Sequence, residues 1–411
     1  MRGGRAAIAA RPRRGTTAHA PAPDEETAMP HAAAVRGTSV PRAEGQGPAG
    51  PLGGRPAHRS ARAAADALGT PYEEPAASPP PDRPRILVLR ALGLGDLLTV
   101  VPALRALRRR WPGHEIVLAG PARLSEPAAA TGLVDRLLPT SAAGRAVPAE
   151  LAWSGPPPDV AVDLHGNGPP SHLLLQRLRP RRLFAYAHPG TPGIEGPVWR
   201  DDEHERERWC RLVSWYGVDA DPADLLIPSP AMPSPAPGAV LVHPGADAAA
   251  RRWPPDRFAA VAAALRGDGH EIVVTAGAGE EALARTVAAE AGLPESAVSG
   301  GAADVPFGRL TALVVRARCV IVGDTGLAHL ATALGTPSVV LFGPVAPRLW
   351  GPPPDPRHRV LWHPGPDDAP RPGDAHGDRP DARLLRITPR EVVDAVRDLP
   401  ERERRSLTRA P

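Results

Sequence analysis

Lysine is absent from this 411-residue chain, so all 49 basic residues are arginine, and they stand against 45 acidic residues. Aromatic residues make up only 4% of the chain. Nucleic-acid-binding modules combine a basic stripe with aromatic rings that stack on bases, and the sequence has neither. The arginines are therefore expected on a solvated surface, and we predict no nucleic-acid partner.

Cysteine and long apolar runs are also scarce. Cys210 and Cys319 are too few for a disulfide framework or a four-thiolate zinc site, which indicates a reducing compartment. The longest apolar runs, such as 320–322 and 338–342, are far shorter than the roughly 20 residues that a bilayer requires. The arginine-rich N-terminus lacks the apolar segment of a secretory signal. We expect a cytoplasmic protein.

Proline and glycine are abundant instead, with 55 and 41 residues, while hydrophobic residues still make up 42% of the chain. Residues 1–83 are mostly Ala, Pro, Gly and Arg, with almost no large apolar side chains. Such a segment cannot bury enough surface to offset its chain entropy. We expect a disordered tail over 1–83, followed by two domains in the remaining length.

From residue 85 onward, apolar runs alternate with helical patterns, which predicts an α/β fold with parallel sheets. A helix is expected where apolar residues recur at positions 97, 101, 104 and 107, with Pro102 opening or kinking it. Strand-like runs lie at 85–90, 115–119, 159–164, 239–243, 271–275, 319–322 and 338–342.

A proline-dense stretch at 228–237 separates two series of strands and helices. It predicts a linker between two doubly wound, Rossmann-like domains that face a cleft. Their expected bounds are 84–232 and 238–387, with a Pro/Asp-rich loop inserted at 351–383. A helix over 388–400 is signalled by Thr388 as N-cap, Pro389, and Glu391 closing a capping box.

The first candidate site is the turn RALGLGD at 90–96, between the first strand and the first helix. Ligands gather at the carboxyl ends of parallel strands, and Gly93 and Gly95 allow close approach of the backbone. Asp96 either caps the helix or serves as a general base toward a substrate hydroxyl. The third glycine of a dinucleotide fingerprint is missing, so an NAD site is not expected here.

The second candidate site is GDTGLAH at 323–329, which leaves a strand and enters a helix. Free amide groups at a helix start, the Thr325 hydroxyl and Gly326 together form a cradle for phosphate. His329, one turn into the helix, is placed to point at the same ligand. Taken singly, Asp324 reads as an N-cap and His329 as a satisfied polar residue.

Two further strand-to-helix loops carry candidate donor-binding residues. His243 and Gly245 follow a strand, and Arg251 and Arg252 come just before a helix, where they either clamp a diphosphate or lie on a solvated surface.

The loop GAGEE at 277–281 places Glu280 and Glu281 at the start of a helix. These carboxylates either bind ribose hydroxyls or simply occupy the favourable first turn. No metal-ligand spacing stands out anywhere in the chain.

The stretches RILVLRALGLGDLLTVVPALRALRRRWPG, LVHPGA with ARRWPPDRF, TAGAGEE and IVGDTGLAHLATALGTPSVVLFGP, in this order, resemble glycosyltransferase family 9, the ADP-heptose:lipopolysaccharide heptosyltransferases. The resemblance spans roughly residues 85–400. It implies a GT-B fold in which the N-terminal domain binds the acceptor and the C-terminal domain binds a nucleotide-sugar. The helix over 388–400 would then lie near the interdomain junction.

The resemblance also implies roles for single residues. Asp96 would be the catalytic base that deprotonates an acceptor hydroxyl, with inversion at the anomeric carbon. Arg251, where the family usually has Lys, would contact the donor phosphates. The remaining implied donor contacts are Arg252, His243, Gly245, Asp324, Thr325, Gly326, His329, and either Glu280 or Glu281. The loop DLHGNG at 163–168, with His165 and Asn167, resembles an acceptor-side loop beside Gly93 and Gly95.

The expected reaction is transfer of heptose or a related sugar from an ADP-linked donor to a glycan or lipid-linked acceptor. No cofactor and no metal are expected beyond the donor. We expect a monomer, with contact to the inner face of the cell membrane if the acceptor is lipid-linked. Two other functions stay open, an inactive relative that only binds nucleotide-sugars and an NAD-dependent oxidoreductase.

Overall fold

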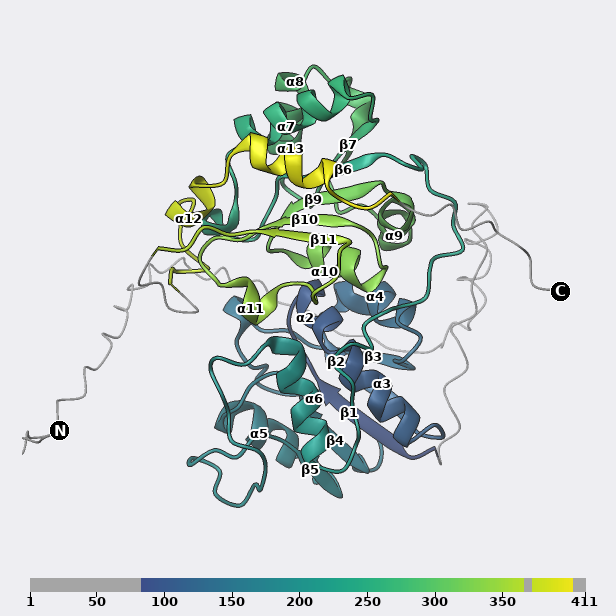
Figure 1. Ribbon diagram of the computed structural model, residues 1–411. Coiled ribbons are helices and arrows are strands. Elements are labelled where there is room, and N and C mark those ends of the chain that lie inside the picture. Colours follow the sequence, from purple (N-terminus) through teal and green to yellow (C-terminus); the bar gives the residue numbers. More distant parts are fainter. Residues whose placement is uncertain (1–82, 366–371, 402–411) are drawn as a thin grey trace, which may run out of the picture. The chain divides into compact units, whose positions relative to one another are not determined.

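The computed structural model describes residues 83–365 and 372–401. The tail predicted over 1–83 therefore lies almost entirely outside the described residues. So does part of the predicted insert, residues 366–371. The described residues belong to one compact unit and contain two parallel sheets (Figure 1).

The first sheet has the strand order β3-β2-β1-β4-β5, and every neighbouring pair is parallel. Its strands are β1 (Arg85–Leu89), β2 (Glu115–Gly120), β3 (Arg136–Pro139), β4 (Val160–Asp163) and β5 (Arg182–Phe184). Its helices are α2 (Leu94–Thr99), α3 (Val101–Arg110), α4 (Ser125–Ala130), α5 (Pro169–Gln176) and α6 (Glu205–Trp215).

The helix predicted after β1 is interrupted at Val100, which ends α2 and precedes α3. Pro102 lies in the first turn of α3, where its missing N–H costs no intrahelical hydrogen bond. The proline thus opens a new helix. Leu97, Val101 and Leu104 are all buried against the sheet, as their spacing predicts.

The second sheet has the order β11-β10-β9-β6-β7-β8, again all parallel. Its strands are β6 (Val240–His243), β7 (Ile272–Ala276), β8 (Val298–Gly300), β9 (Cys319–Gly323), β10 (Ser338–Leu341) and β11 (His358–Leu361). Its helices are α7 (Pro255–Gly267), α8 (Glu281–Glu290), α9 (Phe307–Arg316), α10 (Gly326–Ala333), α11 (Pro347–Trp350), α12 (Ala382–Leu385) and α13 (Pro389–Arg397).

Two predictions for the C-terminal part need correction. The loop expected over 351–383 contains the edge strand β11, which pairs with β10, and the short helix α12. Helix α13 starts with the predicted capping box of Thr388 and Glu391, but its main contacts are with α7, β10 and β11. It covers the second sheet, because its apolar face is needed there, rather than lying at the junction between the domains.

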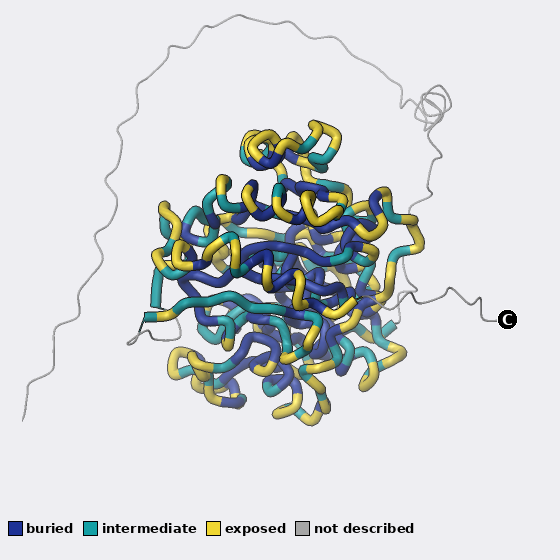
Figure 2. Tube along the Cα trace, turned by 45° about the horizontal axis from the view of Figure 1, so that its top comes forward, coloured by how far each residue is buried: buried dark blue, intermediate teal, exposed yellow. Residues whose placement is uncertain are grey.

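The core lies in and around the two sheets, where the strands carry the most buried residues (Figure 2). Both cysteines are part of it, Cys210 in α6 and Cys319 in β9, and neither forms a disulfide. Burial raises the pKa of each thiol to about 12. Within the described part of the chain, no helix is long and apolar enough to cross a membrane.

The strand order reverses once in each sheet, between β1 and β4 in the first and between β6 and β9 in the second. At such a point the loops at the carboxyl ends of the two strands diverge and leave a crevice, which is where open α/β sheets bind ligands. The loops that follow these four strands carry most of the candidate residues.

Candidate functional site

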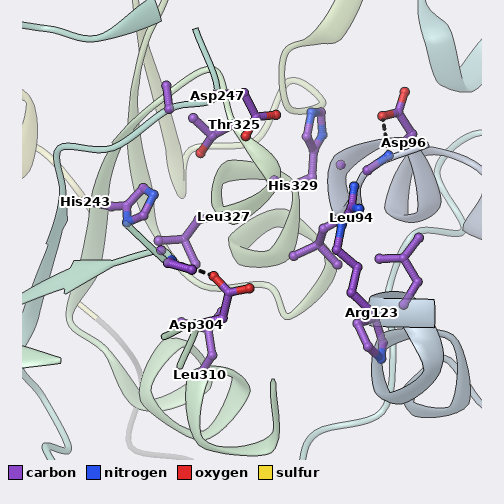
Figure 3. Close-up of a pocket in the computed structure, with 18 of the residues that line it drawn as sticks. Leu94, Asp96, Arg123, His243, Asp247, Asp304, Leu310, Thr325, Leu327 and His329 are labelled. Carbon is purple, nitrogen blue, oxygen red and sulfur yellow. Dashed lines mark hydrogen bonds between the residues drawn. The ribbon is translucent and has the colours of Figure 1, made fainter. Parts of the chain in front are cut away.

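Loops from both sheets line one cleft of about 850 Å³ (Figure 3). The first domain contributes the start of α2, residues 122–127 around the start of α4, and Arg145. The second contributes the loops after β6, β7 and β9. The predicted residues that line it are Gly93, Gly95, Asp96, His243, Arg251, Glu280, Asp324, Thr325, Gly326 and His329.

Asp96 lies in the first turn of α2 and is only 5% exposed. One carboxylate oxygen, Oδ2, accepts a hydrogen bond from the backbone N–H of Gly93 at 3.0 Å. The other, Oδ1, lies 2.8 Å from an Arg145 nitrogen and 3.3 Å from an Arg90 nitrogen. Asp96 therefore caps its helix and also carries an ion-paired oxygen at the cleft, so the two readings of its role do not exclude each other.

The electrostatics of Asp96 favour the ionised form. Burial alone would raise its pKa, but the charges of Arg90 and Arg145 and the hydrogen bonds from Arg145 and Gly93 outweigh burial. The pKa of Asp96 consequently lies below its usual value, and the group is a carboxylate at neutral pH.

The start of α10 faces this carboxylate from the other domain. Thr325 is the N-cap residue of α10, so Asp324 does not cap the helix. The Thr325 hydroxyl oxygen is buried and finds no hydrogen-bond partner within the described residues. Unsatisfied N–H groups at a helix start, next to a free hydroxyl, form a site suited to an anion.

Arg251 reaches the same place from the loop after β6. One terminal nitrogen donates to the backbone oxygen of Asp324 at 3.1 Å, while its Nε is buried and has no partner in the described part of the chain. Burial and the nearby Asp96 carboxylate raise the pKa of Asp324 to about 6, against the opposing effect of Arg251. The second domain thus offers the cleft unused donors and a weakly acidic carboxyl.

Glycines bring the two helix starts into contact. A Cβ on Gly95 would lie 2.7 Å from His329 Cδ2, and a Cβ on Gly326 would lie 3.1 Å from Leu94 Cβ. Residues with side chains at these positions would push α2 and α10 apart. Burial lowers the pKa of His329 to about 4, so the imidazole facing the Asp96 loop is neutral at pH 7.

His243 and Glu280 form the far wall of the cleft. His243 Nδ1 lies 3.0 Å from the carbonyl oxygen of Thr275, so Nδ1 carries the proton and Nε2 does not. Burial lowers the pKa of His243. Glu280 accepts a hydrogen bond from the Gly277 N–H at 2.9 Å. A Cβ on Gly245 would lie 1.9 Å from a Glu280 carboxylate oxygen, so Gly245 leaves room for this side chain.

For the pairs Glu280/Glu281 and Arg251/Arg252, the structure shows which member lines the cleft. Glu281 pairs with Arg285 at 2.8 Å and does not line the cleft, whereas Glu280 does. Arg252 donates to the backbone oxygen of Ala246 at 2.8 Å and likewise lies outside the lining, whereas Arg251 is part of it. Gly245 is not in the lining either, but it lies directly against the lining residue Glu280.

The acceptor-side loop after β4 is only partly brought to the cleft. His165 Nδ1 accepts from the backbone N–H of Ala91 at 3.2 Å, so the ring supports the loop that carries Asp96. Neither His165 nor Asn167 lines the cleft. Burial lowers the pKa of His165 to about 4.

Several lining residues were not predicted from the sequence, namely Arg123, Arg145, Asp247, Asp304, Trp350 and His376. Arg145 is the most informative of them, because it binds Asp96 from a distant 3-10 turn, Ala143–Arg145. Its backbone φ of 65° is unusual for a non-glycine residue. The surrounding sequence SAAGRAV has no pattern that would have indicated the contact.

Among residues 83–365 and 372–401, no group of three or more His, Cys, Asp or Glu side chains is arranged to hold a metal ion.

Comparisons with known proteins agree with this architecture. Residues 220–369 match the sequence model of glycosyltransferase family 9 (heptosyltransferase). Lipopolysaccharide heptosyltransferase 3 of Escherichia coli is 34% identical over 113 residues, which are 28% of this chain and 33% of that protein. The chain thus aligns with about a third of the length of this curated relative.

Solved structures match over a longer stretch. A glycosyl transferase family 9 protein from Veillonella parvula has a TM-score of 0.61 at 20% identity, covering 77% of this chain and 97% of its own. The E. coli ADP-heptose lipopolysaccharide heptosyltransferase II has a TM-score of 0.59 at 20% identity, covering 77% and 98%.

Two Rossmann-like domains with facing loops define the GT-B class of fold, which these structures share. The match of residues 220–369 to the family model bears out, over this part of the chain, the predicted resemblance to glycosyltransferase family 9.

Proposed function

We propose that the protein is an inverting glycosyltransferase that moves a sugar from a nucleoside-diphosphate donor to an acceptor hydroxyl. The observation that carries this proposal is the position of Asp96. Its carboxylate is buried at the start of α2, which is in close contact with the start of α10 through Gly95 and Gly326. On the α10 side of this contact lies the anion site with its unpartnered Thr325 hydroxyl. A base on one wall and a phosphate cradle on the other are what a single displacement at a sugar carbon requires.

On the first wall, Asp96 accepts the proton of the acceptor hydroxyl as the oxygen attacks the anomeric carbon. The carboxylate is ionised at neutral pH, so it is ready to accept. The new bond to the acceptor oxygen forms as the bond to the donor phosphate breaks. One displacement from the face opposite the leaving group inverts the configuration at that carbon.

On the second wall, the departing diphosphate gains negative charge. The N–H groups at the start of α10, the Thr325 hydroxyl and the Arg251 guanidinium are placed to receive it. Arg251 stands where the family usually has Lys, so the positive charge is kept in a planar form able to bind two oxygens. Glu280, on the far wall, is the better placed of the two glutamates for a ribose hydroxyl.

The names of the relatives support a choice of donor sugar and nucleotide. We infer an ADP-linked heptose or related sugar, because the family description and a structural neighbour name heptose and ADP-heptose. The acceptor is then a glycan or lipid-linked hydroxyl bound mainly by the domain over 84–232. For a lipid-linked acceptor, the protein would act at the inner face of the cell membrane. We take it to act as a monomer.

A thermal-shift screen of the full chain tests the donor site. ADP-, GDP-, UDP- and dTDP-linked sugars and NAD are compared, because a ligand that binds only the folded state raises the melting temperature. Stabilisation by ADP-sugars, lost in Arg251→Ala, is expected. Stabilisation by NAD alone would overturn the transferase in favour of an oxidoreductase. Donor binding without transfer to any acceptor, combined with no effect of Asp96→Asn on donor hydrolysis, would indicate an inactive relative.

A further inference from the structure

A second carboxylate, Glu205, lies behind the Asp96 loop and does not line the cleft. It is the first residue of α6 and is 5% exposed. Its Oε1 accepts from Arg90 Nη2 and from Trp209 Nε1, each at 2.8 Å, and its Oε2 accepts from Arg208 at 2.7 Å. Burying a carboxylate costs desolvation free energy, which hydrogen bonds and opposite charges must offset. A charge buried here with these partners therefore suggests a role beyond stability.

Arg90 joins this carboxylate to Asp96. The guanidinium is 1% exposed, and its Nε donates to the backbone oxygen of Asp96 at 3.1 Å, while Nη1 donates to the Leu164 carbonyl. These two bonds hold the group in place. Its Nη2 faces three acceptors: Glu205 Oε1 at 2.8 Å, Asp96 Oδ1 at 3.3 Å and Thr99 Oγ1 at 3.4 Å. An Nη2 group has two hydrogens, so the three oxygens compete for it.

We propose that Glu205 is a positioning residue for the base: by taking the shortest contact to the shared Arg90 nitrogen, it leaves Asp96 only a long contact and keeps that carboxylate able to take a proton. This inference rests on the proposed function, in which Asp96 is the base. A carboxylate that received the full hydrogen bond from a buried guanidinium would be a much weaker base.

The first turn of α6 is also tied to the other domain. His204, the N-cap of α6, places Nε2 3.0 Å from the carbonyl oxygen of Gly351, directly after α11. The preceding residue of that helix, Trp350, lines the cleft and packs edge-on against His329 at 5.9 Å between ring centroids. The helix start that carries Glu205 is therefore also held, through His204, by a contact to the second domain.

The charges around Asp96 determine whether its pKa rises or falls when Glu205 is neutralised. The groups that face it from each packed element are Arg90, Arg145, His165, Asp324 and His329, with Glu205 one contact further. Burial keeps His165 and His329 neutral at pH 7, and also His204 at the start of α6, since the pKa of each is lowered to about 4. Removing the negative charge of Glu205 leaves Arg90 to Asp96 alone, which lowers the pKa of Asp96 further.

The experiment follows the Asp96 carboxyl directly, by ¹³C NMR titration of the full chain carrying ¹³C-carboxyl aspartate. The Asp96 resonance is identified by its loss in Asp96→Asn. An Arg145→Gln background moves the titration to higher pH, because one of the two nearby positive charges is gone. Adding Glu205→Gln in that background is expected to lower the midpoint by about half a unit to one unit.

A matched control is available two residues further along α6. Glu207 is also in the first turn of α6 but is exposed, so Glu207→Gln removes the same charge without touching Arg90. We expect no shift of the Asp96 midpoint in this variant. Glu205→Asp keeps the charge and with it the neutralisation of Arg90 and Arg208, but its shorter side chain loosens the contact to Nη2. It should fold and lower the midpoint by less than Glu205→Gln.

An unchanged or raised midpoint in both Glu205 variants would overturn the inference, as would an equal shift in Glu207→Gln. Should Glu205→Gln not fold, the Glu205→Asp titration decides alone. The titration needs no reaction, so it separates the two proposals. If the Glu205 effect appears but no sugar is transferred, the coupling stands and the proposed function fails. If sugar is transferred and the midpoint does not move, only the inference about Glu205 fails.

Discussion

The two walls of the cleft are built on two parallel sheets, but the polar groups of one wall are paired and those of the other are not. On the first wall, the carboxylate of Asp96 is surrounded by partners, with two arginines and a backbone N–H. On the second, the Thr325 hydroxyl and the Arg251 Nε are buried without partners in the described residues. One wall is complete by itself, and the other is completed only by an anionic ligand. Substitutions should therefore affect catalysis on the first wall and donor affinity on the second.

The largest effect is expected for Asp96→Asn. It keeps the size and the Gly93 cap but removes the group that takes the proton, so the turnover number should fall about 10²- to 10⁴-fold. Donor affinity, measured by calorimetry, should stay within about twofold. Turnover close to wild type would show that another group is the base. A large loss of donor affinity would contradict the assignment of donor binding to the second wall alone.

Arg251→Ala should have the next largest effect, this time on binding. Loss of a hydrogen-bonding charge to a phosphate is expected to weaken the donor by about tenfold to a hundredfold. Arg252→Ala is the matched comparison, because its side chain is held by the Ala246 oxygen outside the cleft. Equilibrium binding of the donor measures both. Equal losses in the two variants would contradict the placement of Arg251 alone in the cleft.

A smaller loss is expected for Gly245→Ala. The added methyl would displace the Glu280 side chain, which is flexible at its end, so stability should hardly change while donor affinity falls about threefold to tenfold. Glu280→Ala should reproduce the loss, and the double variant should be no worse than either single one. Additive losses would show that Gly245 acts through something other than Glu280.

The smallest effect is a shift in pH dependence. Arg145→Gln removes a positive charge that stabilises the Asp96 carboxylate, so the pKa of Asp96 rises. The acid limb of kcat/KM, where activity is lost as the base becomes protonated, should then move to higher pH by about half a unit to one unit. Arg123→Gln removes the same charge from the same wall as a control. Movement of the limb to lower pH would contradict the ion pair.

The strands of the sheet interiors could be predicted because both faces are covered, which requires runs of branched apolar residues. The runs at Arg85–Leu89 and Cys319–Gly323 are of this kind. Edge strands lack that pattern, and all four of them, β3, β5, β8 and β11, were missed from the sequence because they are short and only partly buried. The length of the alternating series was enough to indicate two domains.

The candidate site divides in the same way. Asp96 and the segment of Asp324 to His329 follow strands directly, so their position at the carboxyl edge could be inferred from order along the chain. Arg145 contacts Asp96 across 49 positions and Glu205 contacts Arg90 across 115 positions, only once the domain has folded. No local pattern encodes such contacts. Choosing Glu280 over Glu281 likewise required the direction of each side chain at the start of a helix.

The burial of Cys210 and Cys319 gives the molecule a surface without reactive thiols. Because burial raises the pKa of both to about 12, neither forms an appreciable thiolate at neutral pH. A cysteine introduced at an exposed position on each domain would be modified selectively without removing the native pair. Paired spectroscopic labels would then report how far the walls move when the donor enters, in the otherwise natural chain.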